Sequence, residues 1–208
     1  MGQILMTGFD PFGGEPVNPA LEAVLKLDGH RVAGHTIRSR KVPTVFGESI
    51  KCLERFIAEV RPTLVICVGQ AGGRPDIGVE RIAVNITDAG IPDNIGQKPA
   101  DTPVVAGGPP AYWSTLPVKA IVGRLRENGI PASVSFSAGT FVCNHLFYGL
   151  MHLLQQSGNR ARGGFIHIPF LPEQAARHPG KPSMSLDLVA RGLELAAETS
   201  LATPSEFE

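Results

Sequence analysis

The spacing of hydrophobic positions changes along the chain and predicts alternating strands and helices. Short apolar runs closed by Gly or Pro, typical of buried strands, occupy residues 4–8, 63–69 and 164–168. Weaker strand patterns occupy residues 79–86 and 134–136. Steps of three and four between hydrophobic residues predict amphipathic helices at residues 20–27, 46–60, 118–128, 140–156 and 183–199. Asn18 and Pro19 fit the cap and the first position of the first of these helices.

The order of these elements predicts an α/β fold with a largely parallel sheet, because strand, helix and strand follow one another repeatedly. The 208 residues show no break in composition and no internal repeat, so we expect one domain over residues 1–208. Residues 87–117 are dense in Pro and Gly and predict a long irregular excursion. Excursions of this length inside a compact domain often belong to a functional site.

Composition and charge exclude several classes of protein. With 43% hydrophobic and 18% charged residues, the chain is not expected to be disordered. Nineteen basic residues balance nineteen acidic ones, so nothing in the net charge favours nucleic acid or an anionic membrane as a partner. No apolar run is long enough for a membrane span, and the first ten residues do not resemble a secretory leader.

The three cysteines, Cys52, Cys67 and Cys143, are odd in number, widely spaced and without a CxxC pair. This pattern argues against a disulfide framework and against a zinc site built from thiols. Free thiols fit a reducing compartment, so we expect a cytoplasmic protein.

Cofactor and metal signals are weak. The glycine clusters GFDPFGG and VGQAGG lack the spacing of phosphate-binding loops and are interpreted as turns at strand ends. His145 and His152 lie seven positions apart on one predicted helix face with no carboxylate at helical spacing, so we interpret them as partly buried helix residues. We therefore expect neither a metal ion nor a cofactor.

Cys143 differs from the other two cysteines in its position. Thr140 can cap the predicted helix 140–156, which puts Cys143 in the first turn, where unpaired N–H groups favour a thiolate. Gly139 would let another group approach the backbone. Cys67 is interpreted as a small buried hydrophobic residue, and Cys52 carries no special signal. Position alone leaves a structural and a nucleophilic role open for Cys143.

His167 and Glu80 are candidate partners for a nucleophilic cysteine. Histidine is unusual in an apolar strand such as FIHIP unless both ring nitrogens have partners, and a satisfied core histidine is the alternative. If residues 79–86 form one regular strand, Glu80 shares a face with apolar residues, which favours a site carboxylate. The alternative is that Glu80 lies at an exposed strand start.

Five motifs, in the same order, resemble those of the pyroglutamyl peptidase I family of cysteine peptidases, also called pyrrolidone-carboxylate peptidases. They are residues 8–14 (GFDPFGG), 80–94 (ERIAVNITDAGIPDN), 108–117 (GPPAYWSTLP), 138–144 (AGTFVCN) and 164–173 (GFIHIPFLPE). The resemblance covers essentially the whole chain and includes all three candidate residues.

The resemblance implies a three-layer α/β/α fold and a Cys143–His167–Glu80 triad. It implies removal of N-terminal pyroglutamate (5-oxoproline) from peptides through a thioester acyl-enzyme, without metal or cofactor, by a cytoplasmic protein that is often a homotetramer. In such a triad the cysteine attacks, the histidine transfers the proton and the carboxylate orients the imidazole.

The resemblance also implies a substrate pocket, and it shows one departure from the family pattern. Residues matching the pocket of relatives are Phe9, Phe12, Gln70, Ile91, Phe141 and Val142. Ordinary packing beneath a turn is the alternative for Phe9 and Phe12. The family pattern implies an arginine where this chain has Gly90, so we do not expect a side chain at this position to help the oxyanion.

Two other functions were weighed on the sequence. A nucleoside- or phosphate-using enzyme on a similar scaffold would need a phosphate-binding loop, and no such motif is found. A non-catalytic relative acting as a binding module is disfavoured because Cys143, His167 and Glu80 occur together.

Overall fold

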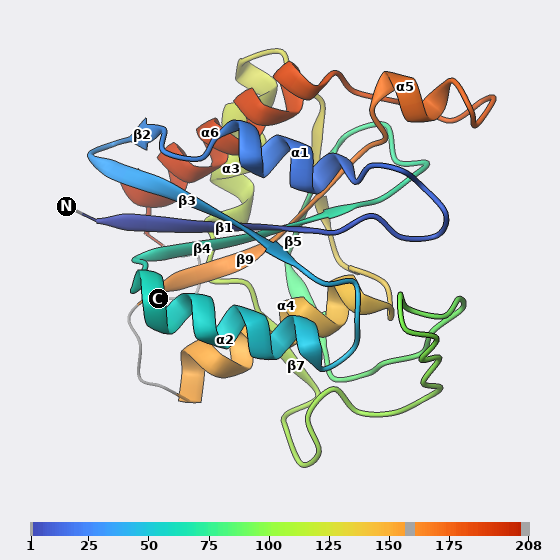
Figure 1. The fold of residues 1–208 in the computed structure, drawn as a ribbon. Coiled ribbons are helices and arrows are strands. Elements are labelled where there is room, and N and C mark those ends of the chain that lie inside the picture. The colour runs from blue at the N-terminus through green and yellow to red at the C-terminus, as the bar shows by residue number, and fades with distance from the viewer. Residues whose placement is uncertain (1, 157–160, 205–208) are drawn as a thin grey trace.

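A seven-stranded mixed sheet runs through the middle of the molecule in the computed structural model, which describes residues 2–156 and 161–204 (Figure 1). Its order is β2-β3-β1-β4-β9-β5-β8. The strands are β1 (Gln3–Phe9), β2 (Arg31–Val32), β3 (His35–Val42), β4 (Leu64–Gln70), β5 (Ile77–Glu80), β8 (Ala132–Ser135) and β9 (Arg162–Ile168). Strands β3, β1, β4 and β9 are mutually parallel, while β2 and the β5–β8 pair run against their neighbours β3 and β9.

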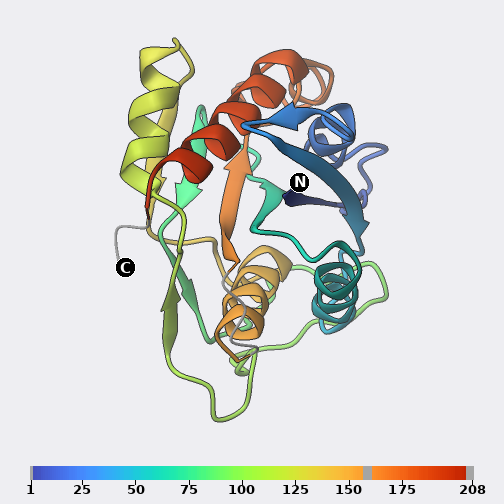
Figure 2. The same cartoon turned by 90° about the vertical axis from the view of Figure 1, so that its left-hand side faces the viewer.

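Helices cover both faces of this sheet and confirm the predicted three-layer α/β/α fold (Figure 2). On one face lie α1 (Pro19–Lys26), α3 (Val118–Glu127) and α6 (Leu186–Ala202), and on the other lie α2 (Glu48–Val60) and α4 (Val142–Gln156). A short helix, α5 (Pro172–Ala175), follows β9. Asn18 caps α1 as predicted, because its side chain accepts a hydrogen bond from the N–H of Ala20 at 3.0 Å.

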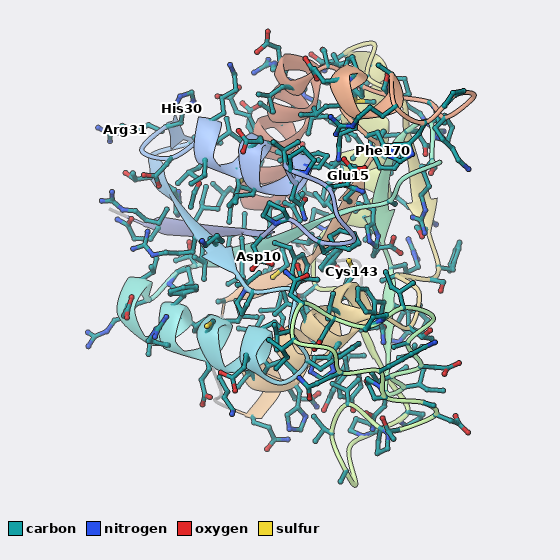
Figure 3. The ribbon with its side chains drawn as sticks, turned by 45° about the vertical axis from the view of Figure 1, so that its right-hand side comes forward. Asp10, Glu15, His30, Arg31, Cys143 and Phe170 are labelled. Carbon is teal, nitrogen blue, oxygen red and sulfur yellow. The ribbon has the colours of Figure 1, made fainter. Side chains whose placement is uncertain are left out.

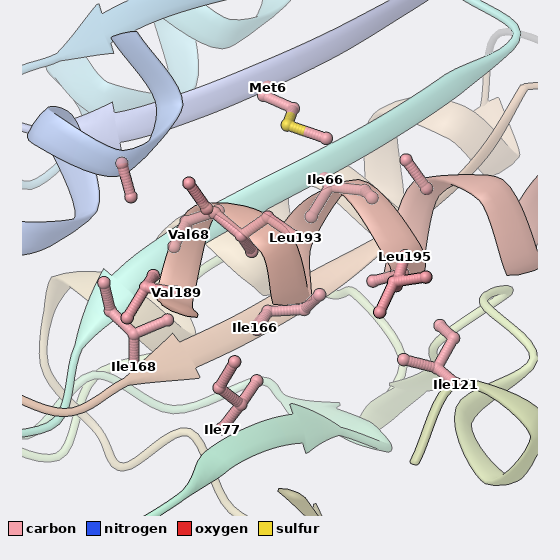
Figure 4. Close-up of a cluster of buried hydrophobic side chains, with 14 of the residues drawn as sticks. Met6, Ile66, Val68, Ile77, Ile121, Ile166, Ile168, Val189, Leu193 and Leu195 are labelled. Atoms are coloured by element: carbon pink, nitrogen blue, oxygen red, sulfur yellow. The ribbon is translucent and has the colours of Figure 1, made fainter. Parts of the chain in front are cut away.

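Two cores hold these layers together, one on each face of the sheet. Because side chains alternate along a strand, Ile66, Val68, Ile166 and Ile168 face α6 and pack against residues such as Leu193 (Figure 4). Val65, Cys67 and Phe165 point to the opposite face and pack beneath α4. This alternation also puts His167 on the α4 face, since it lies two residues after Phe165 on β9.

One predicted strand is wrong in its extent. Residues 79–86 are not a single strand, because β5 ends at Glu80 and a separate strand, β6 (Ile82–Val84), pairs with β7 (Ala111–Trp113) in a two-stranded sheet. Glu80 therefore does not share one regular strand with the apolar residues that follow it, and the predicted common face is wrong. Strand β3 was not predicted because Ile37 and Val42 are its only apolar residues, and the buried position between them holds the polar Ser39.

The excursion at residues 87–117 is irregular as predicted, apart from β7 and an isolated bridge between Thr87 and Thr102. Among the residues that the structure describes, no helix is both long enough and apolar enough to span a membrane.

Candidate active site

His167 and Glu80 form a buried hydrogen-bonded pair on neighbouring strands. His167 lies opposite Gly78 of β5, so Glu80, two residues further on, points from the same face toward the imidazole. The His167 Nδ1 atom lies 2.7 Å from Glu80 Oε1. Glu80 is fully buried at the end of β5, so the exposed-strand alternative is wrong. A carboxylate acceptor at Nδ1 assigns the proton to that nitrogen and leaves Nε2 able to accept one.

The thiol of Cys143 lies on the same face of the sheet, over Gly69 of β4. A Cβ atom built on Gly69 would lie only 2.9 Å from Cys143 Sγ, so a side chain here would displace the sulfur. Gly69 is the direct neighbour of His167 in the parallel β4–β9 pair. The thiol and the imidazole therefore lie above adjacent strands. The backbones of neighbouring strands in a sheet are about 5 Å apart. The glycine that we interpreted as part of a turn lies within β4 and makes room for the sulfur.

The start of α4 differs in detail from the prediction. The helix begins at Val142, so Cys143 is in the first turn as expected (Figure 3). Thr140 does not serve as the expected cap; its hydroxyl donates to the carbonyl of Asp88 at 2.8 Å and ties the helix start to the excursion. Gly139 has a φ of 77°, and a Cβ there would meet nothing within 4 Å, so left-handed backbone rather than close approach explains this glycine.

Burial dominates the protonation state of the thiol. Burial and the Glu80 carboxylate together raise the pKa of Cys143 to about 12, although the charge of Arg74 lowers it. This direction is opposite to the one expected from the helix start, and it favours the neutral thiol. Burial alone would also raise the pKa of Glu80, but the hydrogen bond from His167 and the charges of His167 and Arg74 bring it below its ordinary value.

Arg74 is a residue of this site that the sequence analysis missed. Its Nη1 atom lies 2.8 Å from Glu80 Oε1 and 3.1 Å from the hydroxyl of Ser135, and its Nη2 atom donates to the carbonyl of Ser137 at 2.9 Å. A Cβ on Gly78 would lie 2.8 Å from Arg74 Nη1. A glycine inside an apolar strand was the available signal, since it marks a close approach by another group.

Two of the six expected pocket residues belong to an aromatic group beside the helix start. The rings of Phe12 and Phe141 lie 6.2 Å apart, and Phe46 meets Phe141 edge-on at 5.3 Å. Phe46 was expected only as a helix residue. Phe9 and Val142 are almost fully buried, and Phe9 packs 6.4 Å from Phe165 beneath the site, which favours the packing alternative for Phe9.

Gln70 and Ile91, two further expected pocket residues, lie on different segments. Gln70 ends β4, and its Oε1 atom accepts a hydrogen bond from the buried Gln174 at 3.2 Å. Ile91 lies on the excursion and is 47% exposed. A Cβ on the adjacent Gly90 would meet nothing within 4 Å, so packing does not require glycine there.

Asp93 and Asn94 hold this part of the excursion against the site. The Asp93 carboxylate accepts from the backbone N–H groups of Phe46, Ile95 and Gln97 at 3.0, 3.1 and 2.8 Å. The Asn94 side chain donates to Asp10 Oδ1 at 3.1 Å and to the Pro11 carbonyl at 2.9 Å. The excursion is thus tied both to the start of α2 and to the loop that carries Phe12.

The remaining histidines and cysteines have ordinary protein environments. His145 is buried and its Nε2 atom accepts from the N–H of Gly47 at 3.0 Å, while His152 lies 2.8 Å from the Tyr112 hydroxyl. Cys67 is fully buried, as expected, and burial raises its pKa to about 12. Within residues 2–156 and 161–204, no three His, Cys, Asp or Glu side chains are grouped so that they could hold a metal ion.

Comparison with known proteins gives consistent results. A family model described as pyroglutamyl peptidase matches residues 2–203. Pyrrolidone-carboxylate peptidase 1 of Ralstonia nicotianae is 61% identical over 97% of this chain and 94% of its own, and pyrrolidone-carboxylate peptidase of Bacillus cereus is 60% identical over 96% and 93%.

Solved structures agree with this. Pyroglutamyl peptidase I of Bacillus amyloliquefaciens superposes with a TM-score of 0.95 at 50% identity, covering 98% of both chains. A mutant pyrrolidone carboxyl peptidase of Pyrococcus furiosus superposes at 0.94 with 42% identity, covering 96% of this chain and 98% of that one. The expected family and enzyme class are therefore confirmed, and the chain belongs to the pyroglutamyl peptidase family.

Proposed function

We propose that this protein removes an N-terminal pyroglutamyl residue from peptides as a thiol peptidase, with Cys143, His167 and Glu80 as its triad. The observation that carries the proposal is the buried hydrogen bond of 2.7 Å between His167 and Glu80, on the sheet face where the Cys143 thiol lies. A carboxylate-oriented imidazole next to a thiol is the arrangement that acyl transfer by a cysteine requires.

In the proposed reaction the Cys143 thiol loses its proton as it attacks. Because burial keeps the Cys143 thiol protonated, His167 Nε2 takes the S–H proton as the sulfur bonds to the scissile carbonyl carbon. His167 returns that proton to the leaving nitrogen as the C–N bond breaks, which leaves a thioester on Cys143. Water then attacks the thioester carbonyl carbon while His167 takes its proton. The C–S bond breaks, pyroglutamate leaves, and His167 returns the proton to the Cys143 sulfur. Backbone N–H groups at the start of α4, including that of Cys143, are the proposed oxyanion donors.

Specificity follows from the chemistry of the lactam ring. Pyroglutamate has no free α-amino group and is uncharged, whereas an N-terminal glutaminyl or prolyl residue carries an ammonium charge. Moving that charge beside Phe12 and Phe141 without a partner costs several kcal/mol. Because the Gln70 Oε1 atom already accepts from Gln174, the amide hydrogens of Gln70 are the proposed donors for the lactam carbonyl, which proline lacks.

The test compares kcat/KM for pyroglutamyl, prolyl and glutaminyl amides of one fluorescent amine. We expect the pyroglutamyl amide to exceed the other two by roughly 10⁴-fold. Cys143→Ala should abolish release, and Cys52→Ala, its matched control, should leave it intact. Comparable values for all three amides would contradict the specificity, and full activity of Cys143→Ala would contradict the mechanism.

We further propose that the single domain over residues 1–208 is the whole catalytic unit, and that it acts in the cytoplasm as a homo-oligomer, a tetramer by family resemblance. The three free cysteines support a reducing compartment. Light scattering of the eluted protein at assay concentration measures the assembly, and a monomer that is fully active would contradict the oligomer.

A further inference from the structure

Arg74 donates a hydrogen bond to the same Glu80 oxygen that accepts the hydrogen bond of the His167 imidazole. Glu80 Oε1 has two donors, His167 Nδ1 at 2.7 Å and Arg74 Nη1 at 2.8 Å. The second oxygen, Oε2, is buried without a hydrogen-bond partner in the part of the chain that the structure describes. Both of these hydrogen bonds therefore reach Oε1, and Arg74 is the partner that holds this atom when the imidazole moves a proton.

The guanidinium is itself fixed by contacts outside the triad. Nη1 also donates to the Ser135 hydroxyl at the end of β8, and Nη2 donates to the Ser137 carbonyl just beyond it. Gly78 leaves the room that Nη1 occupies, because any Cβ there would lie 2.8 Å from it. The planar fork thus spans three partners, which the single ammonium of lysine cannot do.

The titratable groups that act on Glu80 and Cys143 come from four elements and one loop. They are His167 from β9, Cys67 from β4, Arg74 from the loop after β4, and the Glu80 carboxyl and Cys143 thiol themselves, from β5 and α4. Arg74 is the permanently charged cation among them, and its charge compensates that of the fully buried Glu80. A buried carboxylate without such a partner would tend to take up a proton and lose its hold on the imidazole.

We propose that Arg74 is a positioning residue of the reaction: it holds Glu80 ionised and in place so that His167 presents Nε2 to the Cys143 thiol. This inference rests on the proposed function and extends it by a fourth residue. Arg74 acts through Glu80 and touches no reacting atom. Because its positive charge opposes protonation around it, it also sets the lowest pH at which the site works.

The test is the pH profile of kcat/KM for the pyroglutamyl amide in Arg74→Gln and Arg74→Lys. Loss of the cation in Arg74→Gln should raise the midpoint of the acid limb by about one pH unit and lower kcat about tenfold. Arg74→Lys keeps the charge but not the contacts to Glu80, Ser135 and Ser137. The midpoint of its acid limb should therefore stay within about 0.3 pH unit of the wild type while kcat falls. Arg191→Gln, which breaks an exposed pair on α6, is the matched control and should change neither.

A second readout separates this inference from the proposed function. Iodoacetamide labelling of Cys143 needs no substrate and follows the thiolate. Because the charge of Arg74 lowers the pKa of this thiol, the pH profile of labelling should also move to higher pH in Arg74→Gln, even if the amide is not cleaved. An equal loss of kcat at every pH, with no shift in either profile, would overturn the inference and leave Arg74 a merely structural residue. If Arg74→Gln does not fold, an Arg74→Lys protein with wild-type kcat would overturn it equally.

Discussion

At the scale of single residues, Glu80 and His167 have different tasks in the proposed reaction. His167 moves the proton in every step, whereas Glu80 fixes the tautomer and stabilises the imidazolium. We expect His167→Ala to lower kcat by more than about a thousandfold and Glu80→Gln by roughly a hundredfold. Initial rates on the pyroglutamyl amide measure both, with circular dichroism as the control for folding. An unchanged rate in Glu80→Gln would leave the carboxylate with a structural role only.

Gly90 lies where the resemblance to the family implies an arginine. Its backbone is not left-handed and a Cβ would meet no atom within 4 Å, so Gly90→Arg should fold with an unchanged Tm. A cation near the oxyanion should raise kcat/KM several-fold. Gly90→Gln is the matched control, because it adds a comparable side chain without charge. Equal kcat/KM for the two variants would show that charge at this position does not help the reaction.

The residues of the proposed triad could be picked out from the sequence because each breaks a local pattern: a histidine in an apolar strand, a cysteine at a helix start, a carboxylate among hydrophobic residues. Arg74 and Asp93 broke none, because charged residues are ordinary in loops. Their importance comes from what the fold brings to them, Glu80 in one case and the N–H groups of Phe46 and Gln97 in the other.

At the scale of elements, the excursion at residues 87–117 depends on one buried carboxylate. Asp93 accepts from three backbone N–H groups and from the Gln97 side chain, and bonds to a charged acceptor contribute about 1.5–3 kcal/mol each. We expect Asp93→Ala to lower the free energy of unfolding by about 3 kcal/mol and to raise KM more than it lowers kcat. Urea unfolding and steady-state kinetics measure the two effects.

Asp88→Ala is the control for this variant, since Asp88 lies on the same excursion with an exposed side chain. It should leave both the unfolding midpoint and KM unchanged. If Asp93→Ala behaved like Asp88→Ala, the carboxylate would not be what holds the excursion.

Most elements were predictable from periodicity, and the errors have physical causes. Buried strands of a parallel sheet are continuous apolar runs, so β1, β4 and β9 stood out. The break between β5 and β6 did not, because Arg81 is one ordinary residue in an alternating stretch. Glu80 was therefore singled out from a strand that does not exist over its predicted length. Its full burial nevertheless agrees with the prediction that its carboxylate lies on an apolar face.

At the scale of the whole molecule, His145 connects stability to pH. Burial lowers its pKa to about 4, and its neutral Nε2 accepts from the N–H of Gly47 at the start of α2. The folded pKa of His145 lies below the unfolded value of about 6.5. The contribution of neutral His145 to the free energy of unfolding is therefore present above pH 6.5 and is lost as pH falls toward 4. Between pH 7 and pH 5 the loss should be about 2 kcal/mol.

His145→Gln cannot titrate and keeps an acceptor, so its free energy of unfolding should fall by about 2 kcal/mol less than that of the wild type over the same range. Urea unfolding at both pH values gives the difference. Identical pH dependence in the two proteins would show that His145 does not carry this effect.

The three-layer fold explains how residues 87 positions apart in the chain, Glu80 and His167, meet beside a thiol from a third element. The central claim is that Cys143 carries the pyroglutamyl group during turnover. Mixing the enzyme with an activated pyroglutamyl ester, quenching in acid and mapping peptides by mass spectrometry tests it most directly. We predict one pyroglutamyl group on the peptide that contains Cys143 and none in Cys143→Ala. Acylation of any other residue, or turnover by Cys143→Ala at the wild-type rate, would contradict the account.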